Sequence, residues 1–224
     1  YGRTPRGWPW IIHAAEGVDA DAAAEFDQLA ALGCLGPNTL LVHGTALGAA
    51  ARAELAARGA GLIWCPASND FLFGTTAQVA DLAAQGRVAL GSDSRLSGGA
   101  DLLAELRGAA ATGQVDAAML LRLVTSQAAD LLRLSSGVGR LTVGAPADLL
   151  VLPRLAATAE ATLLAATRAE VGLVLVGGQP RYGDSVAAFA ACGAPAVGLR
   201  VDGRPKLLAV PLARRMARLG IAEP

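Results

Sequence analysis

The chain contains two histidines, and each one closes a short apolar run. His13 follows residues 10–12 and His43 follows residues 40–42, while Asp93 ends a third run at residues 89–93. Imidazole nitrogens and carboxylate oxygens are good ligands for Zn²⁺ and Fe²⁺. If the runs are parallel strands, the polar residues at their carboxyl ends meet on one face. The spacing therefore predicts a divalent-metal site, Zn or Fe, made by His13, His43 and Asp93; for any one of them alone, helix capping is the alternative.

Glu16 lies three residues after His13, on the segment that leaves the first run. A carboxylate there can take a proton from a metal-bound water and return it to a leaving group. We therefore predict Glu16, His43 and Asp93 as catalytic residues. A solvated loop glutamate is the alternative for Glu16.

Two further residues are predicted to touch a substrate. Asn69 follows the run at residues 61–64 and could either bind substrate or satisfy loop backbone groups. Trp64, with Phe71 and Phe73, could line a pocket for a planar, heterocyclic small molecule or could pack the loop. Cys65 is expected to be a buried small hydrophobic residue rather than a nucleophile.

The elements that must position these residues repeat at the spacing of βα units. Continuous apolar runs of this length are typical of strands buried on both faces. We expect strands at residues 10–12, 39–42, 61–64 and 88–90. Helices are expected at residues 19–32, 46–58 and 75–85, with N-caps at Asp19 and Thr75 and left-handed glycines just after the helix ends. Four such units correspond to half of a TIM barrel, although a doubly wound α/β sheet has the same rhythm.

The predicted secondary structure changes from helical to β-rich in the later part of the chain. Helices are expected at residues 100–111, 115–124 and 126–134, and a β-rich segment with a hairpin at Gly177-Gly178 is expected at residues 137–184. We therefore divide the chain into residues 1–136, 137–184 and a partly helical tail at residues 185–224, with a helix at 211–219.

Composition excludes several classes of protein. Hydrophobic residues make up 53% of the 224, and 19 basic residues balance 19 acidic ones. A disordered chain would need low hydrophobicity and high net charge, and a nucleic-acid or anionic-membrane partner would require a basic surplus. No apolar run reaches the roughly 18 residues of a membrane span. Three scattered cysteines indicate a reducing, cytoplasmic location, and homo-oligomerisation stays open.

The motifs together resemble the amidohydrolase superfamily, most closely its aminohydrolases related to cytosine deaminase and the triazine hydrolases. The similarity runs over residues 8–182 and rests on motifs in the family's order: His13-Ala14-Ala15-Glu16, His43, Cys65-Pro66-Ala67-Ser68-Asn69, Gly91-Ser92-Asp93, residues 125–132 and residues 139–152.

The resemblance implies an α/β fold, with strands 5–8 of a (β/α)₈ barrel and their helices followed by part of a small β-sandwich. It implies that His13 and Asp93 ligate Zn or Fe, that His43 orients the attacking hydroxide or the substrate, and that Glu16 shuttles the proton. The implied reaction is hydrolysis of a non-peptide C–N bond in a small-molecule substrate, with a metal-activated water attacking an amidine- or amide-like carbon.

The chain also departs from the family pattern. The superfamily's first metal motif, His-x-His, has no counterpart among the two histidines. We therefore expect the chain to be the C-terminal portion of a longer enzyme and inactive by itself. The alternatives are a non-catalytic barrel domain that lost its metal, or a cyclic amidohydrolase of the dihydroorotase or hydantoinase type. That type typically uses a carboxylated lysine, whereas the only lysine here, Lys206, lies in the tail.

Overall fold

Two units, Tyr1–Arg140 and Leu141–Pro224, make up the chain in this computed structural model. The structure describes residues 1–5, 7–135 and 137–220. Within the described part of the chain, no helix is long and apolar enough to cross a membrane.

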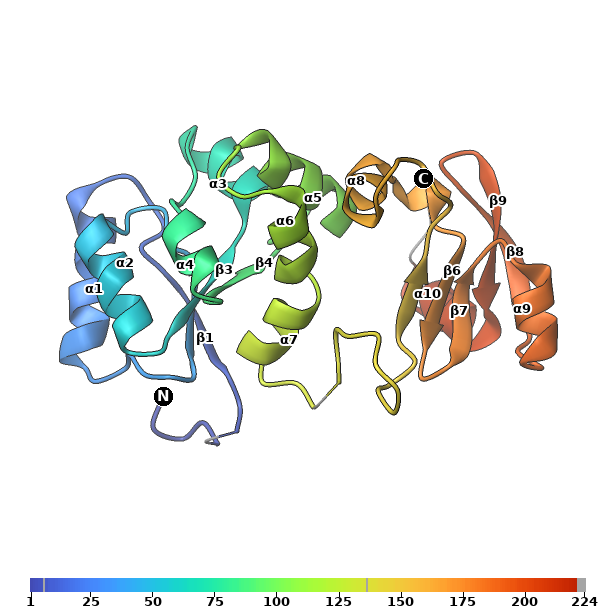
Figure 1. The fold of residues 1–224 in the computed structure, drawn as a ribbon, viewed down its shortest axis with the longest axis horizontal. Coiled ribbons are helices and arrows are strands. Elements are labelled where there is room, and N and C mark those ends of the chain that lie inside the picture. The colour runs from blue at the N-terminus through green and yellow to red at the C-terminus, as the bar shows by residue number, and fades with distance from the viewer. Residues whose placement is uncertain (6, 136, 221–224) are drawn as a thin grey trace. The chain divides into compact units, whose positions relative to one another are not determined.

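The first unit is built on four parallel strands in sequential order (Figure 1). The strands are β1 Trp10–Ala14, β2 Thr39–His43, β3 Gly61–Trp64 and β4 Val88–Leu90. Every residue of β2 and β4 is buried. Because their two faces are covered, these strands are continuously apolar rather than alternating. The four strands expected from the sequence are confirmed.

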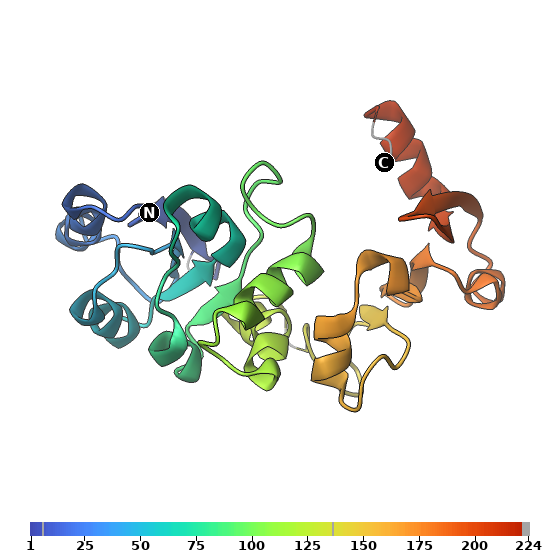
Figure 2. The ribbon, with the colours of Figure 1, turned by 90° about the horizontal axis from the view of Figure 1, so that it is seen from above.

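Helices connect the strands, and the alternation can be followed from blue to green in Figures 1 and 2. The connecting helices are α1 Ala20–Ala31, α2 Ala49–Ala57, α3 Pro66–Phe73 and α4 Ala80–Ala84; α5 Leu102–Ala111, α6 Ala117–Leu123 and α7 Ser126–Leu131 follow β4. Asp19 caps α1 by accepting a hydrogen bond from the Ala22 amide. Gly33, Gly59 and Gly86 have positive φ, as expected after helix ends.

The third connection differs from the expectation. A single helix at residues 75–85 capped by Thr75 is wrong, because α4 begins only at Ala80 and an additional helix, α3, follows β3. Pro66 at the first turn of α3 is a common helix-start signal. The neighbouring Thr76 lies between the two helices, and its hydroxyl accepts hydrogen bonds from the side chains of Trp64 and Asn69.

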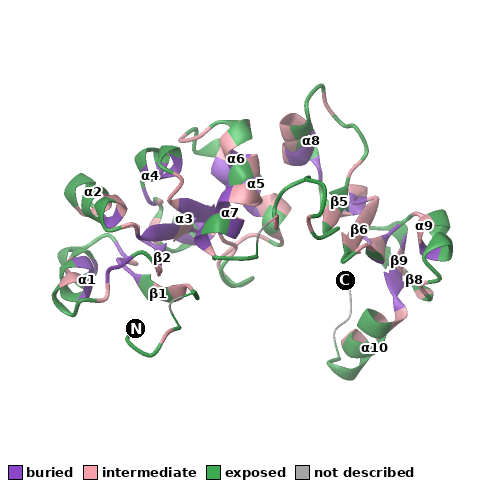
Figure 3. Cartoon of the chain, turned by 60° about the horizontal axis from the view of Figure 1, so that its bottom comes forward, coloured by how far each residue is buried: buried purple, intermediate pink, exposed green. Residues whose placement is uncertain are grey.

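Small aliphatic side chains form the core of this unit. Leu40, Ala89 and Leu131 are buried together, with Ile63, Ala128 and Leu132 against them. A Cβ at Gly61 would lie 2.9 Å from the Leu131 and Leu40 side chains, so a glycine allows α7 to approach the sheet. In Figure 3 the buried colour is concentrated on the strands and the inward sides of the helices of this unit.

The second unit is a five-stranded antiparallel sheet in the order β5-β6-β7-β9-β8. Its strands are β5 Leu149–Val151, β6 Leu173–Val176, β7 Gln179–Gly183, β8 Ala196–Val201 and β9 Arg204–Ala209. Its helices are α8 Ala159–Ala165, the 3₁₀ turn η1 Arg168–Glu170, α9 Val186–Ala191 and α10 Val210–Arg218. Gly177 and Gly178 form the expected two-residue hairpin turn, and both have positive φ.

The C-terminal residues differ from the expected tail. Strands β8 and β9 form a hairpin, and β9 also pairs with β7, so residues 196–209 complete the sheet rather than trail from it. The sheet therefore continues across residue 184, and the described strands of this unit form a single antiparallel sheet. The sequence analysis missed these strands because Gly198 and Pro205 are residue types that are uncommon in strands. The expected helix is α10, and residues 221–224 of the predicted tail lie outside the described residues.

Candidate metal centre

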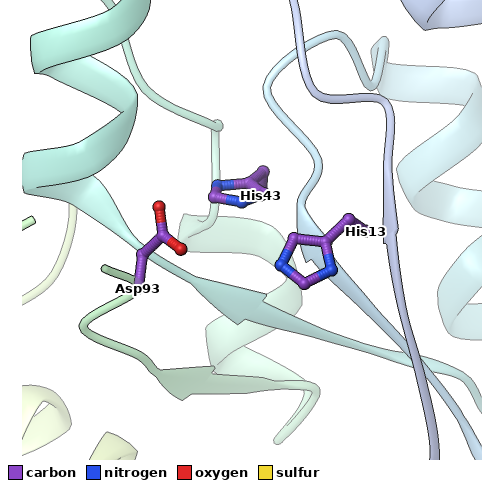
Figure 4. Close-up of side chains that lie close together, drawn as sticks. All are labelled: His13, His43 and Asp93. Carbon is purple, nitrogen blue, oxygen red and sulfur yellow. The ribbon is translucent and has the colours of Figure 1, made fainter. Parts of the chain in front are cut away.

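His13, His43 and Asp93 converge at the carboxyl ends of the parallel strands. One ligand atom from each residue can be chosen so that all three atoms lie within 4.8 Å of one another. The imidazole centroids of the two histidines are 5.3 Å apart. Figure 4 shows the three side chains pointing toward one another from β1, from the end of β2 and from the segment after β4. The structure therefore brings together the three predicted ligands.

The backbone is left-handed at two of the ligands and beside the third. His43 has φ +73° and Asp93 has φ +51°, and Ala15, between His13 and Glu16, has φ +52°. Residues other than glycine rarely adopt this region, and such strain persists only where the surroundings impose it. Here the sharp turns at the strand ends direct the side chains toward one another at the carboxyl edge of the sheet (Figure 4).

His43 is held by one specific hydrogen bond. Its ring is 1% exposed, and its Nδ1 lies 2.8 Å from the Asn69 side-chain oxygen. An amide oxygen only accepts hydrogen bonds, so Nδ1 carries a proton, and in the neutral imidazole Nε2 then presents the lone pair. That Nε2 atom lies 3.5 Å from Oε1 of Glu16, which places the predicted proton carrier at the site.

Two hydroxyl groups orient the Asp93 carboxylate. Ser68 and Ser97 donate to its Oδ2 atom at 2.5 and 3.1 Å. Burial raises the pKa of Asp93, but the hydrogen bonds from Ser68, Ser97 and the Ser94 amide, together with the nearby His43, outweigh it and leave the pKa below its usual value. Asp93 is therefore ionised at neutral pH.

This set of groups suits a divalent cation. Imidazole nitrogens of His13 and His43 and carboxylate oxygens of Glu16 and Asp93 face one another here, and these are the donor atoms that Zn²⁺ and Fe²⁺ accept. Two imidazoles and one carboxylate also match the three protein ligands of a catalytic zinc.

A residue that the sequence analysis missed holds the loop that carries Glu16. Glu25, on α1, accepts a hydrogen bond from the Ala15 amide at 2.8 Å. Ala15 is the left-handed residue next to Glu16, so this bond fixes the turn that brings Glu16 over the site. The available signal was its position on the first helix, one turn before the buried Leu29, which places Glu25 on the inward face.

The two predicted substrate contacts lie elsewhere than expected. Trp64 is completely buried, and its indole N–H donates to the Thr76 hydroxyl at 2.7 Å. This burial favours the alternative that Trp64 packs the loop, because the ring has no exposed surface to offer a substrate. Asn69 is also completely buried and bonds to His43 and Thr76 rather than facing open space.

Glu105 is a second residue that the sequence analysis missed. It is completely buried on α5 and accepts hydrogen bonds from the amides of Gly99 and Ala67, at 2.5 and 3.3 Å. Burial raises the pKa of Glu105 although both bonds oppose the shift. It ties the loop after β4 to the start of α3. A single acidic residue within the apolar segment Leu102–Ala111 was the available signal.

Cys65 behaves as the small hydrophobic residue that was expected. Burial, together with the charges of Asp93 and Glu105, raises the pKa of its thiol to about 12. A thiol in that state holds almost no thiolate at neutral pH, so Cys65 is not a nucleophile there.

Comparison with known proteins gives a consistent result. A model of the amidohydrolase family matches residues 9–180. A 5-methylthioadenosine/S-adenosylhomocysteine deaminase of Teredinibacter turnerae is 36% identical over 135 residues, which are 56% of this chain and 30% of the relative.

Solved structures agree with that similarity. An adenosine deaminase from Xanthomonas campestris with bound zinc superposes with a TM-score of 0.70 at 27% identity, covering 83% of this chain and 49% of the other. A zinc complex of an atrazine chlorohydrolase from Arthrobacter aurescens shares the fold, with a TM-score of 0.65 at 24% identity over 77% of this chain and 44% of the other. The chain thus spans less than a third of the curated relative and about half of each solved chain.

Proposed function

This chain belongs to the amidohydrolase family, and we propose that it contributes the metal ligands and the proton carrier of a hydrolase acting on non-peptide C–N bonds. The observation that carries the proposal is the convergence of His13, His43 and Asp93 within 4.8 Å at the carboxyl ends of parallel strands, where barrel enzymes carry their active sites. We assign the four strands to positions 5–8 of such a barrel.

His13, His43 and Asp93 would hold a divalent metal. We favour zinc over iron because two solved structures with this fold contain it. When bound, the metal supplies a water whose pKa is lowered toward about 7.

Glu16 carries the proton in this proposal. Its Oε1 lies 3.5 Å from His43 Nε2, and a third of its side chain is exposed, so it can reach both a water and a substrate. It would accept the proton of the water and deliver it to the nitrogen that leaves. Asp93 would also assist as a base, with its carboxylate oriented by the hydroxyls of Ser68 and Ser97.

We propose a small planar heterocycle with an exocyclic amino group as the substrate class. The relatives support it, since their names describe deaminases of adenosine derivatives and a chlorohydrolase of a triazine. The balanced charge of the chain offers no attraction to nucleic acid.

The chain's own residues do not favour the alternatives. A barrel that had lost its metal would not be expected to keep three converging ligands. The lysine of a cyclic amidohydrolase has no candidate here, because the Nζ atom of Lys206, the chain's one lysine, donates to the Val171 carbonyl and to Asp184.

Two variants of the full-length natural protein test the proposal. Asp93→Asn tolerates the left-handed backbone but removes a charged ligand, so we expect bound zinc and turnover both to be lost. Glu16→Gln should keep the zinc and lower kcat by about 10²- to 10⁴-fold. Metal analysis and ammonia release from aminopurines, cytosine and aminotriazines provide the two measurements.

Asp130→Asn is the matched control, since Asp130 is an exposed carboxylate on α7 that pairs with the side chain of Arg140. It should change neither zinc content nor kcat. A wild-type protein without metal and without activity on the panel would overturn the proposed function. Full turnover in Glu16→Gln would remove only the role of Glu16.

A further inference from the structure

The third strand of the sheet contributes no metal ligand, yet the residues that follow it contact two of the three. Ser68 and Asn69 are adjacent on α3 and both are completely buried. Buried polar side chains are costly unless they are hydrogen-bonded. Ser68 is hydrogen-bonded to Asp93, and Asn69 is hydrogen-bonded to His43.

We propose that Ser68 and Asn69 are positioning residues that orient Asp93 and His43 for the metal, Asn69 by selecting the His43 tautomer and Ser68 by fixing the rotation of the Asp93 carboxylate. The inference rests on the proposed function and adds two residues to its machinery.

The bond from His43 to Asn69 selects the tautomer. Asn69 Oδ1 lies 2.8 Å from His43 Nδ1, while the Asn69 Nδ2 group donates to the Thr76 hydroxyl at 3.2 Å. Thr76 also receives the indole N–H of Trp64 at 2.7 Å. With its amide nitrogen directed to Thr76, Asn69 presents its oxygen to His43. The proton then stays on Nδ1, and the lone pair of Nε2 faces Glu16 and the metal site.

The bond from Ser68 orients the carboxylate of Asp93. Ser68 Oγ lies 2.5 Å from Oδ2 of Asp93 and 3.0 Å from Oγ of Ser97, which itself donates to the same Oδ2 atom. Ser68 and Ser97 thus both donate to Oδ2, and the Ser94 amide donates to the same carboxylate. These bonds fix the rotation of the carboxylate.

The start of α3 is itself anchored. Pro66 occupies the first turn, and the buried carboxylate of Glu105 accepts the Ala67 amide at 3.3 Å. The same carboxylate accepts the Gly99 amide at 2.5 Å, from the loop that carries Asp93. Ser68 and the Asp93 loop are therefore held against one shared carboxylate.

Two readouts on the full-length natural protein test the inference. In the metal-free protein labelled with ¹⁵N-histidine, the His43 signals, assigned by comparison with His43→Gln, should show a protonated Nδ1 and a bare Nε2. In Asn69→Ala we expect that preference to be lost. Zinc affinity, measured by competition with a chelator, should fall about 10- to 100-fold in Asn69→Ala and in Ser68→Ala.

Two further variants separate positioning from packing. Asn69→Asp retains an acceptor for Nδ1 and should restore the tautomer and bring zinc affinity to within about threefold of the wild type, by the argument that ligand orientation sets affinity. Thr39→Val removes a completely buried hydroxyl, bonded to Cys34 and Gly36 in the same unit, and should leave zinc affinity unchanged. If Asn69→Ala does not fold, the near-isosteric Asn69→Leu takes its place.

Retention of the Nδ1–H tautomer and of wild-type zinc affinity in the Asn69 variants would overturn the role of Asn69. An unchanged affinity in Ser68→Ala would do so for Ser68. A failure of the proposed function is distinguishable, because a wild type that binds no zinc and hydrolyses nothing still reports the His43 tautomer.

Discussion

The two units of the chain differ in where most of their buried polar side chains lie. In the first unit, polar groups are buried around the carboxyl ends of the strands; His43, Ser68, Asn69 and Glu105 are at most 1% exposed. In the second unit, the arginine ion pairs lie at the surface or at its margin, and the buried Lys206 pairs with the exposed Asp184. Arg168 bonds to Asp202 at 2.7 Å and Arg204 approaches Glu170 at 3.4 Å.

The causes of the pKa shifts differ in the same way. The pKa of Asp202 is lowered by the hydrogen bond from Arg168, and that of Glu170 by the hydroxyl of Thr167. The pKa of Asp93 is lowered by Ser68 and Ser97 against the effect of burial. Exposed pairs contribute little to stability, whereas buried polar groups are retained at a cost. The contrast indicates that the arginine pairs of the second unit support local structure, whereas the buried polar groups of the first surround the candidate site.

The largest expected effect concerns the open sheet of the first unit. Among the described residues, β1 and β4 are the edge strands of the parallel sheet, and Ile11 on β1 is 46% exposed. Unpaired edges and bare apolar faces promote association. We expect the 224-residue chain to self-associate in light scattering, and Ile11→Lys to reduce the associated mass because a charge on an edge strand opposes pairing.

Val197→Lys is the control for that experiment. Val197 lies on β8, the edge of the antiparallel sheet, and is 41% exposed. If this variant and not Ile11→Lys reduced association, the second unit would be the associating one. A monodisperse monomer would contradict the prediction for both.

A smaller effect compares two carboxylates. Glu105 accepts two backbone amides with its two oxygens, whereas a glutamine has one acceptor and would direct its NH₂ group at a donor. We expect Glu105→Gln to lower the free energy of unfolding by about 1–3 kcal/mol. Asp202→Asn, which removes an exposed charge and tolerates its left-handed backbone, should have no measurable effect. Chemical denaturation measures both, and equal losses would contradict the distinction between buried and exposed carboxylates.

The smallest effect compares two thiols and leaves function unchanged. Cys65 in the first unit is buried with a thiol pKa raised to about 12, whereas Cys192 in the second is exposed. Because the thiolate is the reactive form, iodoacetamide at pH 8 should label Cys192 and spare Cys65 until the protein is denatured. Mass spectrometry of the peptides decides this. Rapid labelling of Cys65 in the native protein would show that the end of β3 opens.

Local patterns in the sequence were enough to predict the four parallel strands, most of the first unit's helices and the three converging residues. A continuous apolar run followed by a polar residue places that residue at a strand end, and parallel strands share one carboxyl edge. Geometry of this kind needs only neighbouring residues. Where local patterns were weak, as in β8 and β9, the prediction of a tail was wrong.

The contacts that orient the site arise only in the folded chain. His43 and Asn69 are 26 residues apart, Ser68 and Asp93 are 25 apart, and Glu105 is 38 residues from Ala67. Which side chain a buried Asn or Glu meets depends on how α3 and α5 pack against the strand ends, and spacing in the sequence does not carry that information. The sequence therefore determined which residues reach the mouth of the sheet. The tertiary structure decided which nitrogen of His43 is presented and how the carboxylate of Asp93 is rotated, because long-range hydrogen bonds set both.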